Sequence, residues 1–358
     1  MAGIYKGVQA RVMEVNESAK FVPCLAHSLN LVGVHSASSS PDAISLFGLV
    51  QKLYCFFVGS TTRWEIMKQC TKTNLKGSSQ TRWSARHLAV TALINNLPEV
   101  VEALEKIAES SLSAESKYEC SHLLGAVMNF KFILTLIIWS NILREMNRVN
   151  VQIQKEDIII SRSVALMQGL IHTISEMREK SIEFWIEEAT PVSKKLGIEP
   201  ILKSKRIPIK KRQHDEKCGD ESRTLNATQL VSKEIKIIFD KILTEINTRL
   251  ESAKDLNENF AFLNGYAFVN MSAEELQKHG ELLARTYSRD LNILDFCQEL
   301  AVFKKQAPLV IGINEKTTAF DLLQVLYSFP FKQQRSKNGL IGTVRDLQIQ
   351  EELNTMFY

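Results

Sequence analysis

Apolar residues return at three- and four-residue steps along most of this chain, which is the spacing of one buried face of an α-helix. The clearest early run extends from residue 41 to 58 and starts with a proline and an aspartate, as helices often do. Further helices are expected from Arg63, from Trp83 and from Leu97, the last with Asn96 as its cap. The pattern therefore predicts a mainly helical protein.

The middle of the chain carries two longer apolar stretches. The stretch from Leu123 to Leu143 is the most apolar of the sequence, but polar residues such as Asn129 and Lys131 interrupt it. A membrane-spanning helix needs about 20 mainly apolar residues, so we expect a buried helix here and no membrane partner. Residues 158–185 continue the helical period.

The most regular stripe follows Thr228. Its apolar members are Val231, Ile235, Ile238, Phe239, Ile242, Ile246 and Leu250. Such a face must be covered, and we expect it to form an antiparallel pair with residues 158–185. Three more helices are expected near residues 273–286, 289–304 and 318–328.

Two residues near the start of the chain, Cys24 and His27, have side chains that can bind a metal ion. The residues around Phe21 favour a short strand and those after Leu29 favour a helix, so Cys24 and His27 fall where one passes into the other. A Cys-x-x-His pair can supply half of a zinc site, which needs four ligands, but the sequence offers no second pair. The alternative is a buried thiol beside a histidine that bonds to backbone groups. We expect no bound metal.

Composition limits the class of protein. The chain has 358 residues, 45% of them hydrophobic, which is enough for the core of one or two domains. Its six scattered cysteines fit a reducing compartment, either the nucleus or the cytosol. Phosphate-binding glycine loops, zinc-protease motifs and serine-hydrolase motifs are absent from the sequence, so we expect no cofactor.

The segment from residue 189 to 220 is basic. Residues 189–217 hold nine Lys or Arg and three acidic residues, a local net charge of +6, whereas the whole chain carries only +4. Its three prolines should break any long helix, so we expect an exposed linker. Clustered charge of this kind can neutralise phosphates or direct a protein to the nucleus, and it can equally be a solvated loop.

Three motifs together resemble one family. They are Cys24-Leu25-Ala26-His27-Ser28-Leu29-Asn30-Leu31, Arg63-Trp64-Glu65 and Thr81-Arg82-Trp83-Ser84-Ala85-Arg86. Their order is similar to that in the hAT transposase superfamily, and more narrowly in the zinc-finger MYM-type proteins derived from it. The resemblance implies the remnant of a split RNase H-like α/β domain at residues 1–88, and a large all-helical insertion domain at 89–265 with its basic loop at 189–220. A divergent C-terminal helical region would follow at 266–358.

The resemblance also implies a loss of catalysis. In the family, three carboxylates hold the metal ions that activate water. The first would lie upstream of Met1, Cys24 and His27 are the degenerate positions of the second, and the motif with the last glutamate is not found before Tyr358. A thiol is a poor ligand for magnesium. We therefore expect no enzymatic activity and a chain truncated at both ends relative to the family.

Two groups of residues are candidates for nucleic-acid binding. The first is Arg82, Trp83 and Arg86, because the resemblance implies a tryptophan that stacks on a DNA base. The alternative is that Trp83 fills a gap in the core and the two arginines stay solvated. The second group is the basic cluster Lys205, Arg206, Lys210, Lys211 and Arg212.

The expected function is that of a catalytically inactive, transposase-derived protein in the nucleus, associated with nucleic acid or chromatin. One alternative is a helical module for protein–protein interaction or dimerisation, which binds a partner or a second copy and does not touch DNA. Another is a fragment of a full-length transposase-like protein.

Overall fold

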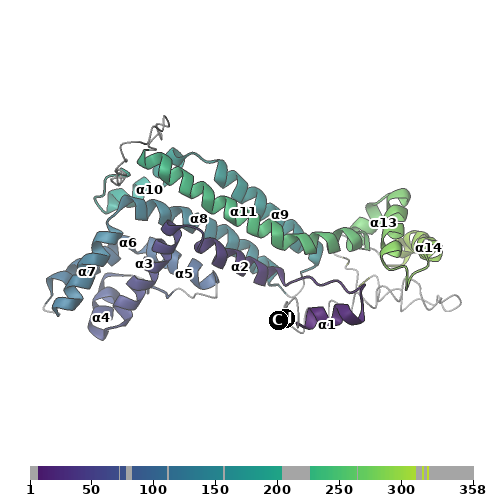
Figure 1. Cartoon of the computed structure of the whole chain (residues 1–358), viewed down its shortest axis with the longest axis horizontal. Coiled ribbons are helices and arrows are strands. Elements are labelled where there is room, and N and C mark those ends of the chain that lie inside the picture. Colours follow the sequence, from purple (N-terminus) through teal and green to yellow (C-terminus); the bar gives the residue numbers. More distant parts are fainter. Residues whose placement is uncertain are drawn as a thin grey trace, which may run out of the picture. The chain divides into compact units, whose positions relative to one another are not determined.

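The protein is described by a computed structural model at residues 7–71, 73–77, 83–110, 113–155, 158–203, 226–263, 265–311, 317 and 321. Within these residues every regular element is a helix (Figure 1), which confirms the mainly helical class. The strand expected around Phe21 is not formed, because residues 19–24 have no regular secondary structure. A strand needs a neighbour for its backbone N–H and C=O groups, and the described segments offer none. An RNase H-like sheet is therefore not part of the described fold.

The helices follow one another through short connections. In chain order they are α1 (Val8–Val15), α2 (Leu25–Ala37), α3 (Pro41–Val58), α4 (Thr61–Cys70), α5 (Trp83–Asn95), α6 (Leu97–Glu109), α7 (Ala114–Val127), α8 (Phe130–Ile153), α9 (Ile160–Glu179), α10 (Ile182–Lys195), α11 (Ala227–Phe260), the 3-10 helix η1 (Ala261–Leu263), α12 (Gly265–Asn270), α13 (Ala273–Thr286) and α14 (Ile293–Ile311).

The chain forms two compact units. Unit 1 comprises Met1–Leu25, Glu156–Ala165 and Arg249–Tyr358, and unit 2 comprises Ala26–Lys155 and Leu166–Thr248. This division follows contacts in space, whereas the expected boundaries at residues 88 and 265 follow the family resemblance. Those boundaries stay predictions.

Unit 2 is built around α8, which is buried along most of its length. At its centre, the edge of the Trp139 ring meets Phe47 of α3, with 5.0 Å between the ring centroids. Helices α3, α5 and α10 all contact α8, and α11 lies along the same bundle (Figure 1). These neighbours exclude water from Trp139 completely, so α8 is the core helix that its composition predicts.

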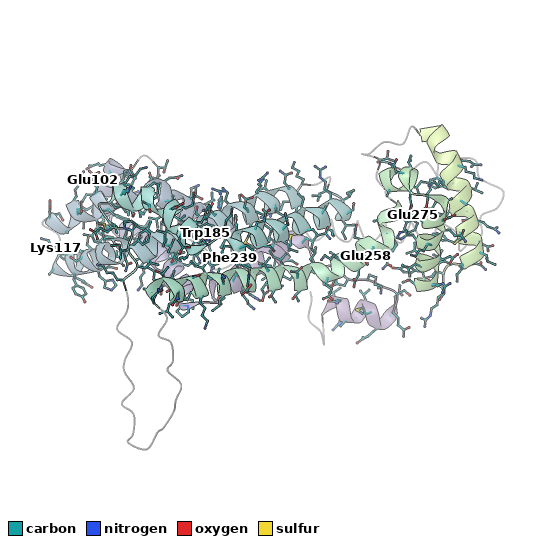
Figure 2. All side chains as sticks on the ribbon, turned by 90° about the horizontal axis from the view of Figure 1, so that it is seen from above. Glu102, Lys117, Trp185, Phe239, Glu258 and Glu275 are labelled. Atoms are coloured by element: carbon teal, nitrogen blue, oxygen red, sulfur yellow. The ribbon has the colours of Figure 1, made fainter. Side chains whose placement is uncertain are left out.

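The stripe predicted on α11 is confirmed, because all seven of its apolar residues are buried. Trp185 of α10 stacks on Phe239 of α11 with 6.2 Å between the ring centroids; both residues are labelled in Figure 2. Arg178, near the end of α9, also donates to Asp240 in the first half of α11 over 3.2 Å. The start of α9 belongs to the same compact unit as the end of α11, so α9 and α11 run antiparallel, as the sequence predicts.

The expectation of a single helix from Leu123 to Leu143 is wrong. The chain turns by 69° between α7 and α8, and the side chain of Asn129 accepts a hydrogen bond from the backbone N–H of Lys131 over 2.9 Å. An asparagine that accepts a bond from the first turn of a helix satisfies one of the donors that have no partner within the helix. Asn129 therefore starts α8 instead of interrupting a longer helix.

The region from residue 158 to 195 also differs from expectation. Ser181 caps α10 by accepting from the N–H of Phe184 over 3.3 Å, so residues 158–185 form two helices instead of one. Pro191, expected to begin a linker, lies inside α10. Burial of Ala189 and Ser193 on the same helix favours its continuation, and the missing N–H of a proline removes only one helical hydrogen bond.

The end of α10 is fixed by Gly197. Its φ angle is +67°, in the left-handed region that glycine occupies without steric cost. The N–H of Gly197 donates to the carbonyl of Lys194 over 3.1 Å, and the N–H of Ile198 donates to Ser193 over 2.9 Å. This pair of bonds is a Schellman motif, which satisfies carbonyls at the helix end.

A charged cluster joins three helices of unit 2. The ammonium of Lys131 in α8 lies 2.5 Å from the carboxylate of Asp42 in α3 and 3.0 Å from that of Glu234 in α11. Burial lowers the pKa of Lys131, but the hydrogen bonds to both carboxylates outweigh the burial and raise it. Burial and the neighbouring Asp42 raise the pKa of Glu234, although Lys131 acts in the opposite direction. The cluster thus holds one cation between two competing acids.

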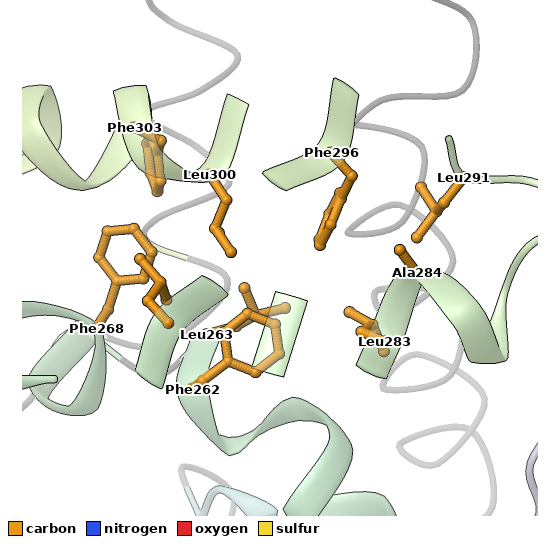
Figure 3. Packing of buried hydrophobic residues seen from close by; sticks show 10 residues of the cluster. Phe262, Leu263, Phe268, Leu283, Ala284, Leu291, Phe296, Leu300 and Phe303 are labelled. Carbon is orange, nitrogen blue, oxygen red and sulfur yellow. The ribbon is translucent and has the colours of Figure 1, made fainter. Parts of the chain in front are cut away.

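Unit 1 has its own apolar core (Figure 3). It is formed by Phe262, Leu263, Phe268, Leu276, Leu283, Ala284, Leu291, Phe296, Leu300 and Phe303, from η1 to α14. Helices α13 and α14 approach closely at Gly280, where an added Cβ would lie 2.9 Å from the side chain of Leu300. The helix expected at residues 273–286 is confirmed, and the one near 289–304 starts later and extends further. The helix expected near 318–328 lies outside the described residues, apart from Asp321.

One helix in the described part of the chain, α3, is long and apolar enough by length and composition to cross a membrane. One face of it, which includes Leu46, Val50 and Leu53, is buried against other helices of unit 2, whereas Ile44 and Val58 are exposed. This is the pattern of a core helix in a helical bundle.

We predict that Gly197→Ala destabilises the protein by about 1 to 2 kcal/mol, because an alanine Cβ is strained in the left-handed region. The matched control is Gly169→Ala in the exposed middle of α9, where no heavy atom lies within 4 Å of an added Cβ. The control should stabilise the protein by about 0.5 to 1 kcal/mol. Urea unfolding of both variants measures the difference, and equal effects would rule out the proposed role of Gly197.

We predict that Glu234→Gln becomes more stabilising, relative to the unchanged protein, as the pH rises from 4.5 toward neutrality. The pKa of Glu234 is raised above its ordinary value of 4.5, so the folded state binds more protons than the unfolded state and loses stability as the pH rises through the raised pKa. Glutamine stays neutral and keeps an oxygen for Lys131. Urea unfolding at several pH values tests this, and a stability difference that does not change with pH contradicts it.

Candidate nucleic-acid interface

The Cys-x-x-His motif lies at the start of α2. Cys24 is half-buried and directly precedes the helix, and His27 is exposed in its first turn. Among the described residues, no group of three or more His, Cys, Asp or Glu side chains is placed to hold a metal ion. The structure therefore offers these two residues no further ligands in the part of the chain that it describes.

The segment that leads to the Thr-Arg-Trp motif is anchored to unit 2. Leu75 is buried, and an added Cβ at Gly77 would lie 2.8 Å from the ring of Tyr54. The side-chain amide of Asn96 donates to the Thr73 hydroxyl and to the carbonyl of Ala92, both over 2.7 Å. The expected capping role of Asn96 is therefore wrong, because its side chain holds the incoming segment instead of the start of α6.

The motif itself is described only in part. Thr81 and Arg82 lie outside the described residues, and the backbone of Trp83 begins α5. Trp83 therefore lies at the start of a helix, as the sequence predicts. The stacking role of Trp83 and its alternative in the core both stay predictions.

Arg86 is one turn into α5 and is directed at an aromatic ring. Its guanidinium carbon lies 5.0 Å from the centroid of Phe47, within the range of a cation–π contact. Burial lowers its pKa, but an arginine stays charged at neutral pH even so. Phe47 also contacts Trp139, so Arg86 connects the start of α5 to the core of unit 2.

Sequence reasoning missed a contribution from α8 to this region. Burial lowers the pKa of His87, and the positive charge of Arg144 lowers it further. Arg144 and Arg148 expose 61% and 77% of their side chains. No local signal in the sequence connects residues 87 and 144, because the packing of α5 on α8 brings them together.

The basic cluster from Lys205 to Arg212 lies outside the described residues. The structure describes the two ends of this segment. Lys194 and Lys195 are exposed in the last turn of α10, where positive charge is favoured by the helix dipole. The chain is described again from Asn226, directly before α11.

Arg63 of the Arg-Trp-Glu motif has structural contacts. Its guanidinium carbon lies 4.3 Å from the centroid of the Phe56 ring, and one of its nitrogens is 3.7 Å from a Glu119 carboxylate oxygen. Only 13% of the Arg63 side chain is exposed. This arginine therefore joins α3, α4 and α7 and is not available to a large ligand.

Two proteins of known name are similar to part of this chain. It is 24% identical over 216 residues to the human protein named "52 kDa repressor of the inhibitor of the protein kinase", and 26% identical over 221 residues to the mouse protein of the same name. Each match covers 56% of this chain and 28% of the relative, so the chain spans well under half the length of these relatives. No family model matches the chain. No solved structure matches it either.

We predict that Asn96→Ala destabilises the protein by about 1 to 3 kcal/mol, because two hydrogen bonds of a buried amide are removed. It should also speed trypsin cleavage after Lys76, which is exposed in the anchored segment. The control is Asn95→Ala, an exposed neighbour at the end of α5, with an expected effect within about 0.5 kcal/mol. Unchanged cleavage at Lys76 in Asn96→Ala would show that Asn96 does not hold this segment.

Proposed function

We propose that this chain is a non-catalytic, transposase-derived protein that acts in the nucleus by binding DNA. Two similarities of sequence support the proposal. The motifs around Cys24, Arg63 and Trp83 resemble those of the hAT superfamily, and the human and mouse relatives are both named as a repressor of the inhibitor of the protein kinase. On this proposal, residues 1–88 descend from an RNase H-like domain and residues 89–265 from its helical insertion.

The observation that carries the proposal is the positive charge around the start of α5. Arg86 is held on the ring of Phe47, and the charge of Arg144 acts on His87, so two cations lie within the first two turns of α5 or beside them. Phosphates bind cations and a base can stack on an aromatic face. The basic segment that follows α10 supplies further charge for the same partner.

The proposal does not include catalysis. Cys24 occupies the position at which the resemblance implies a carboxylate, and hard metal ions such as magnesium prefer oxygen ligands. The DNA-binding part of the proposal needs no metal, because arginine, lysine and aromatic side chains act on DNA without one.

A helical interaction module is the second candidate, and α1 favours it. No residue of α1 is buried, and Val8, Val12 and Val15 expose 56%, 48% and 90% of their surface. A helix of eight residues is not stable alone in water. The exposed valine face of α1 is therefore a place where a protein partner would be favoured.

We predict that replacing Lys205, Arg206, Lys210, Lys211 and Arg212 by glutamine weakens binding to all DNA sequences. The slope of log affinity against log salt concentration should fall by roughly 0.9 for each phosphate of duplex DNA that the variant no longer neutralises. Trp83→Ala should leave that slope unchanged and cost about 1 to 3 kcal/mol, mostly on DNA with an unpaired base. Fluorescence titration of labelled DNA over a salt series measures both effects.

If Trp83 instead fills a gap in the core, Trp83→Ala should lower the free energy of unfolding by about 3 to 5 kcal/mol, as for other large buried aromatic residues. If the unchanged protein shows no salt-sensitive binding to either DNA, the interaction module becomes the better account. The same DNA, incubated with magnesium or manganese, should stay intact. Metal-dependent nicking would overturn the proposed lack of catalysis.

A further inference from the structure

Two arginines on α8 form an exposed basic strip next to α5. Arg144 and Arg148 are one helical turn apart, so they lie on the same face of α8, and both are mainly exposed. Glu145 lies 3.5 Å from Arg144 and 3.4 Å from Arg148, and Asn141 accepts a hydrogen bond from Arg144 over 2.6 Å. These contacts orient both guanidinium groups while leaving them accessible.

The packing of the neighbouring hairpin fixes the direction of α5 against α8. The thiol of Cys120, midway along α7, donates to the carbonyl of Leu104, midway along α6, over 2.9 Å. Because only residues 110–113 separate these two helices, they pair as a hairpin, with the end of α7 beside the start of α6. Helix α5 ends directly before α6, and α8 begins directly after α7. The end of α5 is therefore near the start of α8, and the two helices run antiparallel.

This direction places Arg148 level with the start of α5. Arg144 lies near His87. Trp83 lies one turn before His87 on α5. Because the two helices are antiparallel, the residue of α8 at the level of Trp83 lies one turn after Arg144, which is Arg148. The backbone of Trp83 and the exposed guanidinium of Arg148 thus belong to the same end of the α5–α8 pair.

We propose that Arg144 and Arg148 bind the backbone phosphates of the DNA strand whose base meets Trp83. This inference rests on the proposed DNA binding and extends it to a strip that lies outside the Thr-Arg-Trp motif and the basic segment. A stacked base has phosphates on either side, and two arginines one turn apart suit neighbouring phosphates of one strand.

The ion pairs of the strip with Glu145 do not oppose this role. Glu145 exposes only 19% of its side chain, but the two arginines expose 61% and 77% of theirs, so the outer N–H groups of both guanidinium groups face solvent. Each guanidinium carries five N–H donors, so it can keep its pairing with Glu145 and still offer donors to a phosphate. His87 adds no charge at neutral pH, because burial and Arg144 both lower its pKa.

The test compares two double variants of the full chain in DNA titrations over a salt series. Arg144→Gln with Arg148→Gln should lower the salt slope by roughly 1.8, which corresponds to about 0.9 for each of two phosphates of duplex DNA. Arg144→Lys with Arg148→Lys keeps both charges and should keep most of the slope. The control is Lys68→Gln with Lys106→Gln, which removes the same charge from exposed lysines paired with Glu65 and Glu102 on α4 and α6.

A second measurement links the strip to Trp83. On DNA with one unpaired base, Trp83→Ala and the double glutamine variant should have non-additive effects if they bind the same strand at neighbouring sites. Circular dichroism and the unfolding temperature confirm that each variant is folded. A lysine variant as weak as the glutamine variant, in a folded protein, would point to a role of the arginines within the helix bundle and overturn the inference.

The remaining outcomes separate this inference from the proposed function. If the unchanged protein binds DNA with a clear salt slope, and the glutamine variant behaves like the Lys68 and Lys106 control, the strip is not a phosphate site and the proposed function stands. Additive effects with Trp83→Ala contradict the shared strand. If the unchanged protein shows no salt-sensitive binding, both proposals fail together.

Discussion

The apolar face of α11 is the constraint on which unit 2 depends. Its buried side chains contact the bundle from one side, and each large one removed from water contributes about 1.5 to 3 kcal/mol. Polar contacts fix the same helix at Glu234, Asp240 and Glu245, which pair with Lys131, Arg178 and His35. The partners come from α8, α9 and α2, so helices far apart in the sequence are held by one long helix.

The sequence predicts which face of a helix is buried better than it predicts where the helix begins and ends. The period of apolar residues predicts α3, α11 and α13 well, because a buried face repeats over many residues and a single exception does not hide it. A helix end depends on one or two polar side chains. Asn129 caps α8, whereas Asn96 bonds to Thr73 and Ala92. The same residue type has two uses, and the choice is made by the tertiary partner.

The sequence predicts the residues of the candidate interface only where they are neighbours along the chain. The Thr-Arg-Trp motif and the basic segment stand out in the sequence because their residues are adjacent. The strip on α8 was not predictable in this way, since Arg144 acts on His87 only because α5 packs on α8. Arg86 shows a related limit. Its charge was evident, but the ring of Phe47 beneath it was not.

A chain with a net charge of only +4 cannot attract DNA through its overall field, so any affinity must come from local concentrations of charge. The two local sources differ in kind. The basic segment from Lys205 to Arg212 holds its cations close together in the sequence, and their attraction to phosphates needs no fixed geometry. Arg86, Arg144 and Arg148 are placed by packed helices, so on the proposed DNA binding they would select the position and direction of a strand. The helical core thus has a functional consequence, because the packing that buries Trp139 and Phe47 also determines where the arginines of α5 and α8 lie.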